Sequence, residues 1–315
     1  MQARARFLLP LALLAAACSS TSSDRSPAAE AADAARSTAP ERPIAEIVEG
    51  TRQPEPIGAL LTSLDQQMTA WNNLFLSAQT DVDRSKARTL EKAIMTTAHN
   101  RRQEIQEQLE VGPLNNRIVA AAALGFTRSP DAQSPLLAAL DDDEPQVVAS
   151  ALLGLWLLGR ADTPLDRILA LMTAGETAEV RTNAALCLAT LVKGGARAPS
   201  LIPTLRVGLM DQAPTVRAHC ALTLAELGDT VSFQAIADML NERTTLTVSA
   251  AARAVAFLTT QDNKLRGKGA RALVSAWLRA AEPAKSAIYR AMVELSGTNY
   301  GSNEEDWTRW ASRLP

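Results

Sequence analysis

The chain has 315 residues, of which 47% are hydrophobic and only 4% aromatic. Its formal net charge is −2, whereas nucleic-acid binding needs a clustered basic surface, so we expect no nucleic-acid partner. Alanine and leucine dominate the apolar residues, and strand-like alternation of apolar and polar residues is rare. The composition therefore predicts an all-α protein.

The first segment, residues 1–18, has the pattern of a bacterial export signal. Arg4 and Arg6 precede a short uncharged run, residues 7–17. That run is about half of the roughly 20 residues that span a bilayer, so we expect a signal peptide and not a transmembrane helix.

The residues at the expected cleavage site, Ala15 to Cys18, resemble a bacterial lipobox. Leu14 lies four residues before Cys18, whereas the lipobox usually has leucine three residues before its cysteine. The resemblance implies a lipid on Cys18 and, because no aspartate follows, an anchor in the outer membrane facing the periplasm. The alternative is an ordinary secretion signal cut near Ala17.

Residues 19–55 are rich in alanine, serine, proline and charged residues. Such a segment cannot bury enough apolar surface to offset its chain entropy, which predicts a disordered tether. In residues 56–112, apolar residues recur at steps of three and four, which predicts two amphipathic helices packed as a hairpin. Asp81 or Asp83 should cap the second helix, and Gly112 should end it.

Residues 113–296 contain an internal repeat of two-helix units. Steps of four, four and three residues place one apolar stripe on each second helix, and three segments share these steps: Val147, Ala151, Leu155 and Leu158; Val180, Ala184, Leu188 and Leu191; Val216, Cys220, Leu224 and Leu227. A further unit should begin its second helix at Val248. Glycines close the units and favour left-handed backbone, at Gly125, Gly159, Gly194 and Gly228.

This pattern resembles the short bacterial HEAT repeat, which also occurs in phycobilisome lyases. Residues 209–217, with Ala221, Leu224 and Gly228, carry the resemblance. It implies an α-α superhelix, a HEAT-type solenoid, in which stacked units bury each other's apolar faces. Residues 297–315 are similar to the tail of many bacterial HEAT-repeat proteins. Trp307 and Trp310 should form a cap on the last repeat, with an aromatic binding site as the alternative.

The sequence shows no catalytic or metal-binding motif. His219 and Cys220 are adjacent on a helix and point about 100° apart, so they cannot act as a pair. His99 lies on a polar stretch, and Cys187 and Cys220 should be buried and unpaired. The acidic run 141–144 lacks the spaced carboxylates of a calcium loop. We therefore expect no enzyme, no cofactor, no metal and no convergent polar pocket.

Arg181 and Arg217 hold equivalent positions in two repeats. In the family such arginines often pair with an acidic residue of a neighbouring turn, here Asp211 for Arg217, which would make them a structural ladder. The alternative, and our candidate for a protein-binding face, is a basic strip along the solenoid.

The function expected from these features is that of a lipid-anchored scaffold or assembly factor in the bacterial cell envelope. It would bind another envelope protein through the repeat surface and the membrane through the lipid on Cys18. The alternative, by analogy with the lyases that share the repeat, is an enzyme or a protein that handles a chromophore or other ligand.

Overall fold

The computed structural model describes residues 55–78 and 80–315. This part of the chain is all α-helical and contains no strand. Cys18, the signal peptide and nearly all of the expected tether lie outside the described residues. Among the described residues, no helix has the length and apolarity that crossing a membrane would require.

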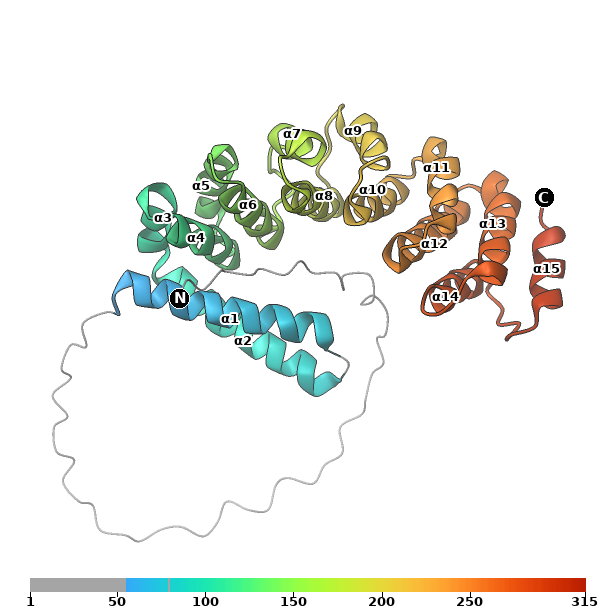
Figure 1. Cartoon of the computed structure of the whole chain (residues 1–315), viewed down its shortest axis with the longest axis horizontal. Helices are drawn as coiled ribbons and strands as arrows, with labels where there is room; N and C mark the ends of the chain where they lie inside the picture. Colours follow the sequence, from blue (N-terminus) through green and yellow to red (C-terminus); the bar gives the residue numbers. More distant parts are fainter. Residues whose placement is uncertain (1–54, 79) are drawn as a thin grey trace, which may run out of the picture.

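Helix pairs form an arch with an outer and an inner layer (Figure 1). The first helix of each pair lies on the outer, convex side, and the second lies on the inner, concave side. The outer helices are α3 (Arg102–Val111), α5 (Gln133–Ala138), α7 (Asp166–Ala174), α9 (Leu201–Gly208), α11 (Phe233–Asp238) and α13 (Arg266–Arg279). The inner helices are α4 (Leu114–Phe126), α6 (Pro145–Leu158), α8 (Ala178–Lys193), α10 (Pro214–Glu226), α12 (Thr245–Gln261) and α14 (Ala284–Ser296).

Short 3₁₀ turns adjoin three of the outer helices, namely η1 (Pro130–Ala132) and η2 (Ala139–Asp141) around α5, η3 (Thr230–Ser232) and η4 (Met239–Asn241) around α11, and η5 (Asn263–Leu265) before α13. The inner helices are longer than α5, α7, α9 and α11 and pack on one another in series. Each unit therefore buries the apolar face of its neighbour, as the HEAT-type solenoid requires.

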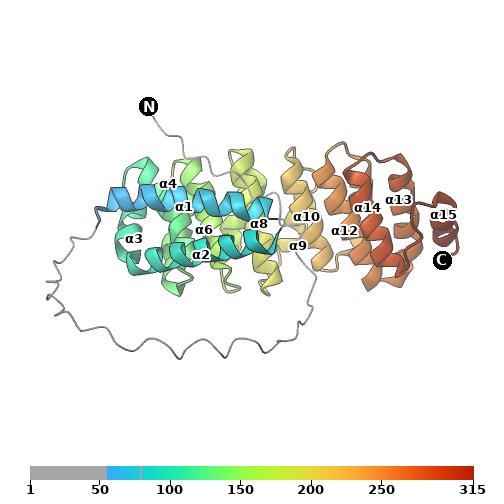
Figure 2. The same ribbon diagram turned by 90° about the horizontal axis from the view of Figure 1, so that it is seen from below.

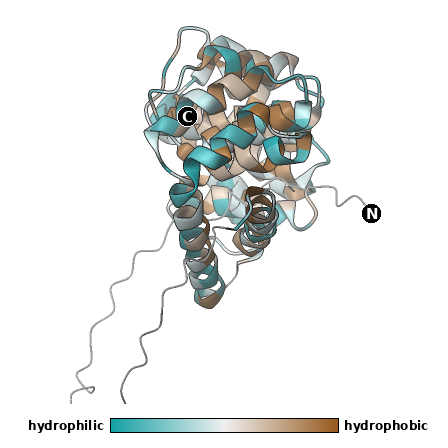
Figure 3. Ribbon diagram, turned by 90° about the vertical axis from the view of Figure 1, so that its left-hand side faces the viewer, coloured by the Kyte–Doolittle hydropathy of each residue, from teal (hydrophilic) through white to brown (hydrophobic). Residues whose placement is uncertain are grey.

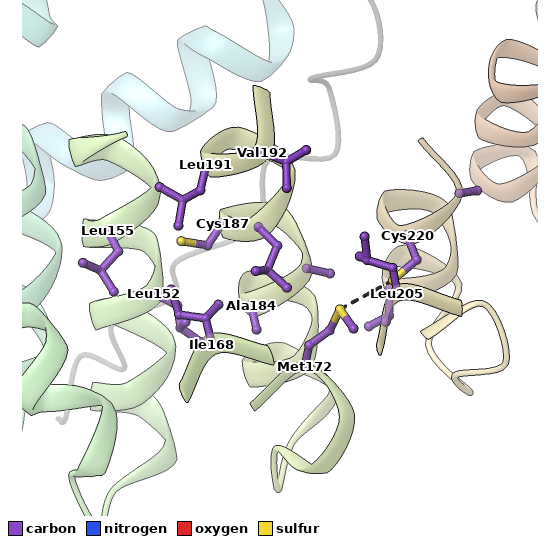
Figure 4. Close-up of a cluster of buried hydrophobic side chains, with 14 of the residues drawn as sticks. Leu152, Leu155, Ile168, Met172, Ala184, Cys187, Leu191, Val192, Leu205 and Cys220 are labelled. Atoms are coloured by element: carbon purple, nitrogen blue, oxygen red, sulfur yellow. Dashed lines mark hydrogen bonds between the residues drawn. The ribbon is translucent and has the colours of Figure 1, made fainter. Parts of the chain in front are cut away.

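The apolar stripes of the inner helices form the core. Figure 4 shows one part of it, where Leu152 and Leu155 of α6 and Ala184 and Cys187 of α8 lie between the two layers. Cys220 of α10 lies 3.6 Å from the sulfur of Met172, and both cysteines are free and buried. The prediction of buried, unpaired thiols at Cys187 and Cys220 is confirmed.

The repeat register of α12 differs from the prediction by one residue. Thr247 is 0% exposed and takes the place of Val216, and Ala251, Val255 and Leu258 follow it at the same steps of four, four and three. Val248, which we expected at the start of this stripe, lies one position later. The threonine is polar, and its hydroxyl donates to the carbonyl of Thr244, which makes its burial possible.

Two of the four expected glycine positions are not left-handed. Gly159 and Gly228 have φ values of 62° and 69°, as predicted, whereas at the end of α8 Gly195 has positive φ in place of Gly194. Gly125 lies inside α4, and a Cβ there would collide with the backbone of Gly154 in α6. Gly125 is therefore needed for the close approach of two inner helices and not for a turn.

The expected second hairpin helix is divided at Arg101 into α2 (Asp81–Asn100) and α3. Only α1 (Ile57–Ser77) and α2 form the hairpin, while α3 is the outer helix of the first repeat. Thr80, and neither aspartate, is the N-cap of α2, and the carboxylate of Asp83 completes its capping box. The expected end at Gly112 is confirmed.

The hairpin crosses the concave side of the arch. Seen from below, α1 and α2 run across α4 and α6 as far as α8 (Figure 2). The hairpin packs on α4, where the ring of Trp71 meets Phe126 edge-on with centroids 5.1 Å apart. Seen end-on, it extends from one side of the repeat body, with hydrophobic residues on helix faces that meet (Figure 3).

The last helix, α15 (Glu304–Ser312), packs on α13 at the other end of the array. Trp307 is 0% exposed, and its ring contacts Tyr289, Tyr300 and Trp310 edge-on. Its indole nitrogen donates to the carbonyl of Gly301. The aromatic residues of the tail therefore cover the end of the last repeat, with Trp310 half-buried at its edge.

Candidate ligand pocket on the concave face

The edge where the outer helices turn into the inner ones carries a ladder of arginines. Arg117, Arg181 and Arg217 are each the fourth residue of their helices, α4, α8 and α10. Each pairs with an acid in the next turn that joins an outer helix to an inner one: Arg117 with Asp142, Arg181 with Asp211, and Arg217 with Glu242. We call these three arginines the arginine ladder.

Each arginine of the ladder also donates a hydrogen bond to a backbone carbonyl just before its own helix. Arg181 donates to the carbonyl of Gly175 at 3.1 Å and, through Nε, to Asp211 at 2.7 Å. Arg217 donates to Glu242 and to the carbonyl of Asp211. The sequence predicted Asp211 as the ionic partner of Arg217, and this pairing is wrong, because the carboxylate of Asp211 pairs with Arg181 in the preceding repeat.

These contacts occupy Arg181 and Arg217 with neighbouring repeats, which is the structural alternative considered from the sequence. Both side chains are 17% exposed. Their role as a protein-binding face stays a prediction. The acidic run has a similar use, since Asp141 pairs with Arg167 and Asp142 with Arg117. The described residues contain no cluster of side chains that could hold a metal ion.

A pocket of about 220 Å³ opens on the concave face between α8, α10 and α12. The apolar part of its lining comes from Leu186, Leu222 and Phe257, with alanines between them. Our expectation that the solenoid has no convergent polar pocket is wrong, because His219, Lys193, Glu226 and Arg253 also line this space. We call it the concave pocket.

Three rows of equivalent positions in the inner helices supply the concave pocket. Six residues after the start of each stripe, the row reads Leu153, Leu186, Leu222 and Arg253. Ten residues after it, the row reads Leu157, Thr190, Glu226 and Phe257, and three residues after it, Ser150, Asn183, His219 and Ala250. These rows vary in chemistry along the array, whereas the stripe is apolar in α6, α8 and α10 and contains one polar residue, Thr247, in α12.

His219 lies among apolar side chains in the concave pocket, and this burial lowers the pKa of its imidazole from 6.5 to about 4. The ring is therefore neutral at neutral pH and can accept a proton or a hydrogen bond. In contrast, burial raises the pKa of the Cys187 and Cys220 thiols, which makes them poor nucleophiles. His99 is exposed on α2 and lies far from His219 in the sequence.

Sequence reasoning missed Lys193, Arg253 and Phe257. The signal that could have found them is the row that places Arg253 after three leucines. Because the expected stripe of α12 started one residue late, at Val248, Arg253 was not recognised as the residue that replaces a leucine. His219 was considered only as a partner of Cys220, whereas it lines the pocket.

Comparisons with known proteins define the class of the repeats. Residues 165–256 match HEAT repeats, and residues 117–142 match the PBS lyase HEAT-like repeat. The chain therefore contains HEAT-like repeats stacked in an all-α solenoid, as the sequence resemblance predicted.

Among solved structures, the complex of CpcE and CpcF of phycocyanin lyase from Nostoc sp. PCC7120 is similar, with a TM-score of 0.40. The identity is 14%, and the similarity covers 80% of this chain and 100% of that chain. A search of curated protein sequences gave no match.

The prediction that the protein is not an enzyme is contradicted by the match of residues 117–142 to the PBS lyase HEAT-like repeat. The physical reason for the error lies in the search for motifs. The lack of a local catalytic motif does not exclude an enzyme, because the site of a solenoid can be assembled from single residues on several helices.

Proposed function

We propose that the protein handles a small, largely apolar ligand, which it binds in the concave pocket, and that it is of the HEAT-like lyase type. The observation that carries this proposal is the convergence of apolar and polar side chains from α8, α10 and α12 on one space. Ligand pockets combine an apolar lining with a few polar groups in the same way.

The size of the concave pocket limits the ligand. Drug-sized molecules occupy pockets of roughly 300–1,000 Å³, and the concave pocket, at about 220 Å³, is smaller. A compact aromatic molecule, or one ring of a longer molecule, fits this space. The aromatic ring of Phe257, which is 36% exposed, offers a face on which such a ring can stack.

His219 supplies the chemical group for a lyase-type reaction. Its imidazole is neutral at neutral pH and can accept a proton from a ligand bound beside it, but the lowered pKa makes it a weaker base than an exposed histidine. We propose His219 as the candidate general base. Replacing His219 with Gln should leave ligand binding in place and abolish turnover of whatever molecule co-purifies with the protein.

Binding is tested with an uncharged fluorescent probe, 2-naphthylmethanol, and by native mass spectrometry for a co-purified ligand. Ala189→Trp should fill the concave pocket and abolish probe binding, since Ala189 lines it. Ala178→Trp, on the exposed first turn of the same helix, is the matched control. The proposal is wrong if the wild-type protein binds no probe, or if Ala189→Trp binds it as well as the control does.

A second proposal keeps the partner protein expected from the sequence. The inner helices form one continuous concave side, and solenoids use such surfaces to bind other proteins. Photocrosslinking from an unnatural residue at position 290 on α14 should trap that partner, while the same residue at position 268 on α13 is the control. Equal yields at both positions would argue against the concave side.

We propose further that Cys18 anchors the protein to the bacterial cell envelope, at the outer membrane. The support is the lipobox resemblance in the sequence. Cys18→Ser should move the protein from the membrane fraction to the soluble fraction and prevent labelling by radioactive palmitate. A wild-type protein that takes up no label and washes off membranes with salt would exclude the anchor.

A further inference from the structure

We propose that the exposed face of the outer helix α13 binds an anionic phospholipid surface. Four exposed basic side chains form what we call the basic face: Lys264 of the 3₁₀ turn η5, which runs directly into α13, and Lys268, Arg271 and Arg279 of α13. The basic face belongs to the convex side of the array, so this proposal is independent of the concave pocket.

The basic face comes from a stretch of sequence without acidic residues. Residues 263–281 contain five basic residues and no aspartate or glutamate, whereas the whole chain carries a formal net charge of −2. Steps of four, three and eight residues place the four side chains of the basic face on one side of a helix. Ser275 and Leu278 stand on the same side and are also exposed. No acidic side chain therefore interrupts this side of α13.

Basic residues of other outer helices are neutralised by acids. Three outer helices each pair an arginine with an acid of a nearby turn: Arg102 with Asp131, Arg167 with Asp141, and Arg206 with Asp229. In contrast, no ion pair among the described residues includes a side chain of the basic face. The outer surface of α13 therefore departs from the pattern of the other repeats.

The two arginines of the basic face donate hydrogen bonds to neutral groups. Arg271 donates to the carbonyl of Leu314 at 3.1 Å. Arg279 donates to the hydroxyl of Ser275 at 2.5 Å and to the side-chain oxygen of Asn241 at 2.6 Å. These bonds orient the guanidinium groups but leave their positive charge uncompensated.

The acids at the two ends of this stretch serve local hydrogen bonds. Asp262 accepts from the backbone N–H of Lys264 at 2.9 Å, and Glu282 accepts from the hydroxyl of Ser286 at 2.7 Å. Lys264 and Lys268 are four residues apart, and like charges at this spacing repel each other on a helix. A negatively charged partner would remove this repulsion, which is a physical reason to expect one.

The position and composition of the basic face favour a lipid surface over other anionic partners. The outer helices lie on the convex side of the arch, which a flat membrane can contact without a groove (Figure 1). Leu278 is 41% exposed beside the basic side chains and can enter the boundary between head groups and acyl chains. Clusters of lysine and arginine are attracted to membranes that contain anionic lipids. A basic patch is also a common second contact of proteins that carry a lipid, as we propose for Cys18.

The test measures binding of the Cys18→Ser protein to vesicles by sedimentation, so that no lipid on Cys18 contributes. One set of vesicles is phosphatidylcholine alone, and the other contains equal amounts of phosphatidylcholine and phosphatidylglycerol. We expect the anionic vesicles to bind at least about tenfold more tightly. Raising the ionic strength from about 0.05 M to about 0.5 M should reduce this preference.

Variants in the Cys18→Ser background locate the contact. Lys264→Gln with Lys268→Gln should weaken binding to the anionic vesicles about 30-fold, roughly fivefold for each lysine. Lys86→Gln with Lys92→Gln removes the same charge from exposed positions of α2 and is the matched control, which should bind as the parent does. Leu278→Ser should also weaken binding. Circular dichroism in urea checks that all variants are folded.

Competition with soluble polyanions distinguishes the lipid surface from other partners. If polyglutamate or duplex DNA binds the protein more tightly than the anionic vesicles do, the partner is an acidic polypeptide or a nucleic acid and the proposal is wrong. It is also overturned if the protein shows no preference for anionic vesicles, or if the control on α2 weakens binding as much as the change on the basic face. None of these outcomes bears on ligand binding in the concave pocket.

Discussion

Basic residues have different surroundings on two parts of this solenoid: the turn edge, where the outer helices turn into the inner ones, and the concave side. At the turn edge, Arg117, Arg181 and Arg217 recur at one repeat position, and each pairs with an acid of the next repeat. On the concave side, Lys193 and Arg253 stand at different repeat positions and line a pocket with His219.

We interpret this difference as a separation of the residues that stabilise the stacking of repeats from those of the proposed ligand site. A residue that recurs in register meets the same neighbour each time, so it serves the stacking of units. A residue that departs from its row meets a unique environment and can serve a ligand. In this chain the arginine ladder recurs, whereas Arg253 interrupts a row of leucines.

The largest change in stability is expected for variants of the arginine ladder, and its absence would contradict the comparison. The double change Arg181→Glu with Arg217→Glu places acids against Asp211 and Glu242 and should lower the free energy of unfolding by about 3–5 kcal/mol, the range for broken buried ion pairs. Urea unfolding followed by circular dichroism measures it.

Arg290→Glu is the control for that double change, since Arg290 is exposed and belongs to no ion pair among the described residues. It should change the free energy of unfolding by no more than about 0.5 kcal/mol. A double variant as stable as the wild type that loses its partner protein would instead support Arg181 and Arg217 as the binding face.

A smaller effect distinguishes the shape of the guanidinium from its charge. Arg217 donates both to Glu242 and to the carbonyls of Asp211 and Gln212. Lysine keeps the charge but loses the planar fork, so Arg217→Lys should cost about 1–2 kcal/mol. An Arg217→Lys protein as stable as the wild type would show that the planar guanidinium adds nothing to the stacking of repeats beyond its charge.

The repeat architecture could be predicted because it depends on local periodicity. The stripe of Val216, Cys220, Leu224 and Leu227 specifies a helix face wherever it occurs, and stacking follows from the uncovered apolar surface. The helix break at Arg101 could not be predicted, because neither proline nor glycine marks it. There, Arg101 pairs with Glu104 and donates to the carbonyl of Glu55, which is distant in sequence.

The concave pocket depends on a register that the sequence left uncertain. Placing Arg253 in the row of Leu222 requires Thr247 to start the stripe of α12, and a buried threonine was not expected there. The prediction of the ionic partner of Arg217 was wrong for a related reason. The sequence cannot show whether an arginine reaches its own turn or that of the next repeat, and here it does both, through different atoms.

The protonation of His219 gives a further test of the apolar character of the concave pocket. In a His99→Gln background the single remaining imidazole should titrate near pH 4 by NMR, as burial lowers its pKa. Because the unfolded chain binds this proton near pH 6.5 and the folded chain only near pH 4, stability should fall as pH drops through this range. His219→Gln should remove that part of the pH dependence, whereas titration near pH 6.5 would mean that water fills the pocket.

The smallest expected effect concerns the stability of variants at the pocket rim. Lys193 is exposed, and substitutions at exposed positions usually change the free energy of unfolding by no more than about 0.5 kcal/mol. Lys193→Gln should therefore unfold at nearly the same urea concentration as the wild type. A loss of stability comparable to that of Arg217→Lys would assign Lys193 to the stacking of repeats. The distinction between a turn edge that stabilises the stacking of repeats and a concave side that is proposed to bind a ligand would then no longer hold.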